Sequence, residues 1–170
     1  MRKISMNKLA VGKSHPNRAL VEFSSAELQG ALGGGSLISA ALRLYVVDSN
    51  VGGAAIGVHR LKTGWVESGA TYNSANDPNT ANNLAEGPLW SMADPDPAQR
   101  PFEAAPTAVI GQNSGSGGYV EWPVSADVAR FYLGLEDNFG WCVKLEEEAA
   151  AGPGKADYAS RESAHPPQLV

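Results

Sequence analysis

Residues 37–47 alternate apolar and polar side chains, and this period of two is typical of a β-strand with one buried face. The apolar face holds Ile38, Ala40, Leu42, Leu44 and Val46, and the other face holds Ser39, Arg43 and Tyr45. Residues 48–53 (DSNVGG) have the composition of a tight turn, and residues 55–61 return as an apolar strand. We therefore expect these two strands to pair as a hairpin.

Turn-forming residues divide the rest of the chain into short elements. The chain has 170 residues, of which 19 are Gly, 11 are Pro and 43% are hydrophobic, and this composition favours many short strands over a helical bundle. The length suits one domain spanning residues 1–170. Further strands are expected at residues 3–11, 19–23, 107–110, 118–124, 139–147, 156–160 and 168–170. The sequence thus predicts an all-β fold.

Two short helical segments interrupt the strands. Ser24 or Ser25 can cap a helical turn over residues 24–32, which the glycines at 33–35 end. Ser125 is expected to cap a short helix that runs to Leu133.

Residues 73–106 differ from the rest, because Asn, Asp and Pro recur there and exclude long regular structure. We predict a long loop insertion, held down by Leu89, Trp90 and Phe102. Asp94 and Asp96 could bind calcium through hard oxygen ligands, although Asp in such a loop is more often a turn former. No other cofactor is expected.

Four segments occur in the order found in DNRLRE domains. They are residues 18–24 (RALVEFS), 38–46 (ISAALRLYV), 65–73 (WVESGATYN), and 160–162 (SRE) followed by 166–170 (PPQLV). The chain resembles that family nearly from end to end, with Tyr72, Phe131 and Pro166 as departures from its pattern. The resemblance implies a jelly-roll-like antiparallel β-sandwich, found on secreted and cell-surface proteins, similar to modules that bind alginate and related polysaccharides. It implies no catalytic residues.

Ligand binding by such a module would combine an exposed ring with polar partners, because sugars stack on rings and their hydroxyls bond to polar groups. Tyr45, on the polar face of its strand, is the best candidate ring, and a basic neighbour would pair with the carboxylates of uronic acids. The predicted ligand-binding residues are Arg43, Tyr45, His59, Tyr72, Trp90 and Arg161, with Tyr119 and Tyr132 as weaker rings. Trp65, Trp122 and Trp141 are assigned to the core.

Catalytic chemistry has little support in the sequence. The three histidines lie far apart, and the single cysteine, Cys142, faces away from the apolar side of its strand, so a zinc site and a thiol nucleophile are not expected. Glu67 beside Trp65 suggests a glycosidase acid, but no second carboxylate is placed with it. We expect a protein that is not an enzyme.

The charge and hydropathy of the chain restrict the kinds of partner that it can bind. The formal net charge of −5 argues against nucleic acid, and no run of about 18 apolar residues predicts a membrane span. No signal peptide is visible at the start, and strands are expected close to both ends. Two roles remain, both extracellular or on a particle surface. One is a module that binds polysaccharide or cell-surface glycan. The alternative is a structural protein on the exterior of a phage virion, in contact with neighbouring subunits.

Overall fold

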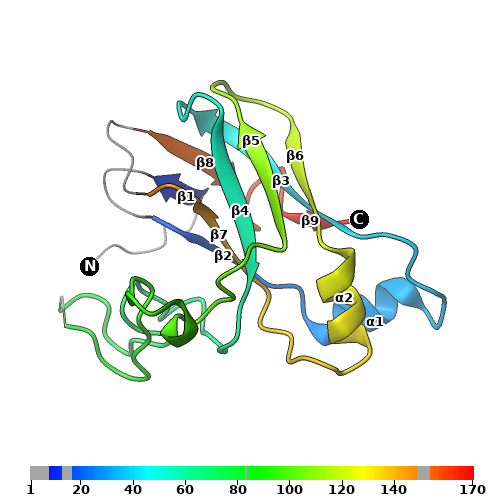
Figure 1. The fold of residues 1–170 in the computed structure, drawn as a ribbon, viewed down its shortest axis with the longest axis horizontal. Coiled ribbons are helices and arrows are strands. Elements are labelled where there is room, and N and C mark those ends of the chain that lie inside the picture. Colours follow the sequence, from blue (N-terminus) through cyan, green and yellow to red (C-terminus); the bar gives the residue numbers. More distant parts are fainter. Residues whose placement is uncertain (1–7, 13–16, 83, 149–153) are drawn as a thin grey trace.

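The computed structural model describes residues 8–12, 17–82, 84–148 and 154–170, and they form two antiparallel sheets packed face to face (Figure 1). The first sheet has the order β1-β8-β3-β6, and the short strand β9 also pairs with β3. The second has the order β2-β7-β4-β5. This order is that of a jelly roll, in which most consecutive strands lie in opposite sheets. The predicted all-β sandwich is confirmed.

The strand bounds follow the predicted segments closely. The first sheet contains β1 (Lys8–Gly12), β3 (Ala41–Ser49), β6 (Tyr119–Pro123), β8 (Lys155–Ala159) and β9 (Gln168–Leu169). The second contains β2 (Ala19–Val21), β4 (Ala54–Arg60), β5 (Ala108–Gln112) and β7 (Trp141–Leu145). Residues 3–7 of the predicted first strand lie outside the described residues.

The alternation in β3 sets the inner and outer faces of the first sheet. Leu42, Leu44 and Val46 are buried in the core between the sheets, as predicted, whereas Arg43 and Tyr45 are half-exposed on the outer face. Ile38 was predicted on the buried face and is 96% exposed, because β3 begins only at Ala41.

The expected hairpin between β3 and β4 is wrong. β3 pairs with β6, β8 and β9, and β4 pairs with β5 and β7, so the turn between them crosses from one sheet to the other. Its glycines do adopt positive φ, at 62° for Gly52 and 84° for Gly53. Val51 is buried in the core, so the turn closes one end of the sandwich, and local turn chemistry does not distinguish this crossing from a hairpin.

Two short helices close another part of the core. Helix α1 (Ser25–Leu32) is capped by Ser24 and ends at Gly33 with φ of 52°, and both the serine cap and the glycine end were predicted. Ser24 and Glu27 in addition form a capping box. Helix α2 (Ser125–Tyr132) is present, but Ser125 does not cap it. The Ser125 hydroxyl instead bonds to the backbone of Ala40, so it ties the helix to the start of β3.

The long loop forms a second apolar cluster on the outer face of the second sheet. Trp90 and Phe102 are buried there as predicted, together with Met92 from the loop and Cys142 from β7. Leu89, predicted to help hold the loop, is 68% exposed. The only regular element in the described residues of the loop is the 3-10 helix η1 (Pro97–Gln99). None of the helices in the described part of the chain is long and apolar enough to cross a membrane.

Candidate functional site

A cleft of about 510 Å³ opens where the end of β2, the segment after β4 and the connection between β8 and β9 meet. Its lining consists of residues 20–24 and 27, 65 and 67, 160–161, and 166–167. We call it the Trp65 cleft. Its walls come from three segments that the sequence singled out, at 18–24, 65–73 and 160–170, which are far apart in the chain.

The first wall is built by the transition from β2 to α1. Leu20 and Val21 are buried, and each packs into a different apolar cluster, so the backbone at the end of β2 is fixed. The capping box then holds the next turn, because Glu27 accepts hydrogen bonds from the backbone and the hydroxyl of Ser24, at 2.6 and 2.7 Å. Glu22 and Phe23 are therefore presented at the cleft by a rigid backbone.

The opposite walls carry a ring and an ion pair. The Trp65 indole donates a hydrogen bond of 3.0 Å to the carbonyl of Phe139, and its ring is half-buried against the second apolar cluster. Arg161 lies 2.9 Å from Glu67 and 2.8 Å from Glu162. This guanidinium joins the segment after β4 to the connection between β8 and β9, across the cleft.

The electrostatics of the cleft are acidic. Desolvation, with the negative charge of Glu27 as a second cause, raises the pKa of Glu22. Hydrogen bonds from Ser24 lower the pKa of Glu27, which keeps that carboxylate ionised. The hydrogen bond to Glu162 and the charge of Glu67 raise the pKa of Arg161. The cleft therefore offers ionised acceptors and a guanidinium that is already paired.

Two of the predicted binding residues, Arg43 and Tyr45, lie together on the outer face of the first sheet. Tyr45 stacks on His165, with ring centroids 4.1 Å apart, and meets the edge of Tyr119. The Arg43 guanidinium lies over the Tyr119 ring, 2.7 Å from Glu121. We call this group the Tyr45 face. Its rings and charges contact one another, and one face of Tyr45 is covered.

The other predicted residues lie elsewhere. His59 is 1% exposed on the outer face of the second sheet, where its ring nitrogens contact the Glu103 carbonyl and the Glu146 carboxylate, each at 2.8 Å. Trp90 is 8% exposed and its indole donates to the carbonyl of Thr71. Tyr72 packs against the second cluster, beneath the Arg18 guanidinium. Arg161 is the one predicted residue that lines the Trp65 cleft.

Asp94 and Asp96 each close a local turn. The Asp94 carboxylate accepts a hydrogen bond from the backbone N–H of Asp96. The Asp96 carboxylate accepts one from the backbone N–H of Ala98 and so caps η1. Within the described residues, no group of three or more His, Cys, Asp or Glu side chains could hold a metal ion. Calcium binding stays a prediction.

Sequence reasoning missed Glu22, Phe23 and the late prolines as neighbours of Trp65 and Arg161. The S-x-x-E pattern at 24–27 was a visible sign, since a capping box fixes the residues that precede it. No local sequence pattern indicated that this turn would face residues 160–167, because that contact follows from the order of strands in the sheets.

No protein-family model matches the chain, and no curated protein sequence matches it. The resemblance to DNRLRE domains stays a prediction from the sequence. Fold and site define a class of protein: a jelly-roll β-sandwich with an open cleft lined by carboxylates and aromatic rings.

Proposed function

We propose that this protein is a non-catalytic recognition module that binds polysaccharide in the Trp65 cleft. The observation that carries the proposal is the meeting of two aromatic side chains, Trp65 and Phe23, with carboxylates and a guanidinium in one open cleft. Sugars need such a mixture, because their apolar faces stack on rings while their hydroxyls bond to charged and polar groups.

The size and rigidity of the cleft support this function. A volume of about 510 Å³ falls within the range typical of small-molecule sites, about 300–1,000 Å³. The capping box holds the first wall, the Trp65 hydrogen bond holds the second, and the Arg161–Glu67 ion pair links the second wall to the third. A preformed site loses little conformational entropy on binding, which favours recognition of a flexible chain.

The hydrogen bonds and ion pairs of the cleft carboxylates support binding without catalysis. Glycoside hydrolysis needs two carboxyl groups, one protonated to act as the acid. Glu67 is paired with Arg161, and Glu27 accepts two hydrogen bonds from Ser24. Desolvation raises the pKa of Glu22, so this side chain is a candidate acid, but Glu67 and Glu27 are both engaged and leave it without a free partner.

Retention on immobilised polysaccharides tests the proposal. The wild-type protein is compared with Arg161→Ala and Glu67→Gln, which remove exposed side chains from the cleft, and with Arg43→Ala and Tyr45→Ala on the Tyr45 face, all with and without calcium. We expect the cleft variants to weaken retention about tenfold and the Tyr45-face variants to retain it. Retention by no polysaccharide in a panel of neutral, amino and acidic glycans would overturn the function. If only the Tyr45-face variants lost retention, the binding site would lie on the Tyr45 face and not in the Trp65 cleft.

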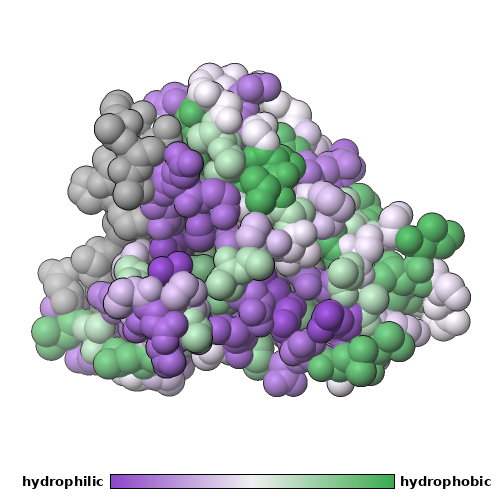
Figure 2. All heavy atoms as spheres, viewed as in Figure 1, coloured by the Kyte–Doolittle hydropathy of each residue, from purple (hydrophilic) through white to green (hydrophobic). Residues whose placement is uncertain are grey.

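Exposed apolar side chains favour a second function, a structural subunit on the outside of a phage particle. Leu84 and Leu89 on the long loop are 61% and 68% exposed, and Leu133 and Leu135 after α2 are 66% and 68% exposed. Figure 2 shows hydrophobic side chains gathered at separate corners of one face of the molecule. Such residues suit contacts with neighbouring subunits. Concentration-dependent association in analytical ultracentrifugation, abolished by Leu84→Glu or Leu133→Glu, would support this role, and a strictly monomeric protein would count against it.

A further inference from the structure

We infer that the Trp65 cleft selects saccharides without carboxylates and binds most tightly those with a protonated amine, such as hexosamine polymers. This inference rests on the proposed function and names its ligand class. It departs from the expectation that a basic side chain near a ring would recognise uronic acids.

The first step concerns Arg161, the only basic side chain among the described residues that line the cleft. Its guanidinium lies between two carboxylates, Glu67 at 2.9 Å and Glu162 at 2.8 Å. These two carboxylates already balance the charge of the guanidinium, and a uronate that approached Arg161 would also lie close to both of them. The guanidinium is therefore not a free anion receptor.

The second step concerns Glu22, which lines the cleft and makes no hydrogen bond or ion pair within the described residues. Glu27, also in the lining, is held by Ser24 and stays ionised. Glu22 and Glu27, of which Glu22 is unpaired among the described residues, place a local excess of negative charge at the cleft. Desolvation is the larger cause of the raised pKa of Glu22, and the charge of Glu27 is the smaller one. An ammonium group relieves this excess, and a carboxylate increases it.

The third step is the ring geometry. Trp65 and Phe23 are half-buried in the same lining, so each has a face or edge available for an apolar sugar surface. Stacking does not distinguish a neutral hexose from a hexosamine. The rings therefore account for binding of any hexose polymer, and Glu22 accounts for the preference among them.

The experiment compares three oligosaccharides of equal length and β-1,4 linkage that differ in charge: glucosamine, glucose and glucuronate or mannuronate polymers. Affinities are measured by titration calorimetry in mildly acidic buffer at low and physiological salt. We expect the glucosamine oligomer to bind about tenfold more tightly than the glucose oligomer, and the uronate more weakly than both. Salt should weaken only the binding of the glucosamine oligomer.

The matched variants are Glu22→Gln in the cleft and Glu121→Gln on the Tyr45 face. Glu22→Gln should abolish the preference for glucosamine over glucose, because the amide carries no charge, and Glu121→Gln should change neither the preference nor the affinities. Tightest binding by the uronate, or an unchanged preference in Glu22→Gln, overturns the inference while polysaccharide binding itself survives. Binding of none of the three also overturns the inference, and retention on the polysaccharide panel then decides the proposed function separately.

Discussion

Gly57 in β4 is required by a buried polar cluster on the outer face of the second sheet. A Cβ atom at Gly57 would overlap Oε1 of Glu146 and lie 3.1 Å from Nε2 of His59. Glu146 Oε1 also accepts from Lys144 Nζ at 3.2 Å. Because all three charged or polar side chains converge above this glycine, the residue's lack of a side chain, rather than its backbone flexibility, determines its role.

We expect Gly57→Ala to displace the Glu146 carboxylate and to lower the free energy of unfolding by about 2–4 kcal/mol. Urea unfolding monitored by tryptophan fluorescence measures the change. Gly30→Ala is the matched control, because nothing lies within 4 Å of its added Cβ and it sits inside helix α1. That control should stabilise the protein by about 0.5–1 kcal/mol. Equal stability of Gly57→Ala and the wild type would show that the cluster contributes nothing.

The same cluster predicts a pH dependence. Burial alone would raise the pKa of Glu146, but the hydrogen bond from His59 and the charge of Lys144 outweigh it and hold the pKa below its ordinary value. A carboxylate with a lowered folded pKa contributes stability above its unfolded pKa, near 4.3, and loses that contribution as the pH falls through the folded value.

Glu146→Gln should therefore destabilise the protein at neutral pH, and its difference from the wild type should shrink in acid. Denaturant unfolding of both proteins across this range measures the difference. Glu121→Gln, at an exposed ion pair, is the control and should change stability little at either pH. A difference between Glu146→Gln and the wild type that does not vary with pH contradicts the assignment.

Cys142 gives a prediction about reactivity. The thiol is fully buried, and burial raises its pKa to about 12, so almost no thiolate forms at neutral pH. We expect no reaction of the native protein with a thiol-specific chromogenic reagent within hours, and complete reaction after unfolding in denaturant. Rapid labelling of the native protein would show that the second apolar cluster opens readily.

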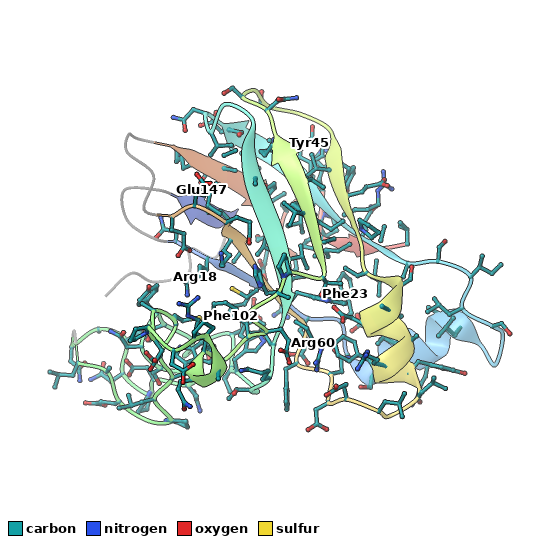
Figure 3. All side chains as sticks on the ribbon, in the orientation of Figure 1. Arg18, Phe23, Tyr45, Arg60, Phe102 and Glu147 are labelled. Atoms are coloured by element: carbon teal, nitrogen blue, oxygen red, sulfur yellow. The ribbon has the colours of Figure 1, made fainter. Side chains whose placement is uncertain are left out.

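Among the elements, the long loop depends on Arg18, which lies just before β2. Its guanidinium makes two hydrogen bonds to the Glu148 carboxylate, at 2.7 and 2.6 Å, and a third to the carbonyl of Met92 in the loop. It also lies over the rings of Tyr72 and Phe102, 5.4 and 5.2 Å from their centroids. Figure 3 shows Arg18 close to Phe102 and well apart from Tyr45.

Arg18→Met keeps much of the side-chain length but removes these bonds and leaves Glu148 unpaired. We expect it to cost about 3 kcal/mol and to increase hydrogen exchange in residues 73–106 more than in β3 or β6. Arg130→Ala, at a side chain 54% exposed, is the control and should leave the loop protected. Unchanged exchange in the loop of Arg18→Met would mean that Trp90 and Phe102 hold the loop without it.

The sequence was sufficient to predict which segments form strands and which of their residues face the core, because both depend on local periodicity. In β7 the odd positions were predicted to face the core, and Trp141, Val143 and Leu145 do, while Cys142 faces the second cluster. Pairing could not be predicted in the same way. The turn at residues 48–53 has the same chemistry in a hairpin as in a crossing between sheets, so the partner of β4 depends on contacts far along the chain.

At the scale of the whole molecule, the jelly-roll order determines what the candidate site contains. The segments at 18–24, 65–73 and 160–167 were each singled out from the sequence, but only the order of strands brings them to one cleft. The same order separates His59 from Tyr45, which lie on the outer faces of opposite sheets. Single-residue patterns contain no information on such distant pairing, so the composition of the cleft could not be predicted.

The two apolar clusters imply two levels of stability. The cluster between the sheets includes Trp122, which is fully buried in β6 and donates a hydrogen bond of 2.9 Å to the Ile56 carbonyl of the other sheet. The second cluster, with Phe102, lies between the outer face of the second sheet and the loop. Loss of the first cluster should affect every strand, whereas loss of the second should affect the loop.

Trp122→Phe keeps an aromatic ring but removes the hydrogen bond between the sheets and leaves a small cavity. We therefore expect the free energy of unfolding to fall by about 2–3 kcal/mol. Hydrogen exchange should become faster in both sheets and in the loop. Phe102→Leu should raise exchange in residues 73–106 at low denaturant while β3, β6 and β8 keep their protection. Native-state hydrogen exchange, measured by mass spectrometry at increasing urea, distinguishes the effect of Trp122→Phe from that of Phe102→Leu. If Phe102→Leu accelerates exchange equally everywhere, the loop and the sandwich unfold as one cooperative unit, because the second cluster then contributes to the stability of every strand.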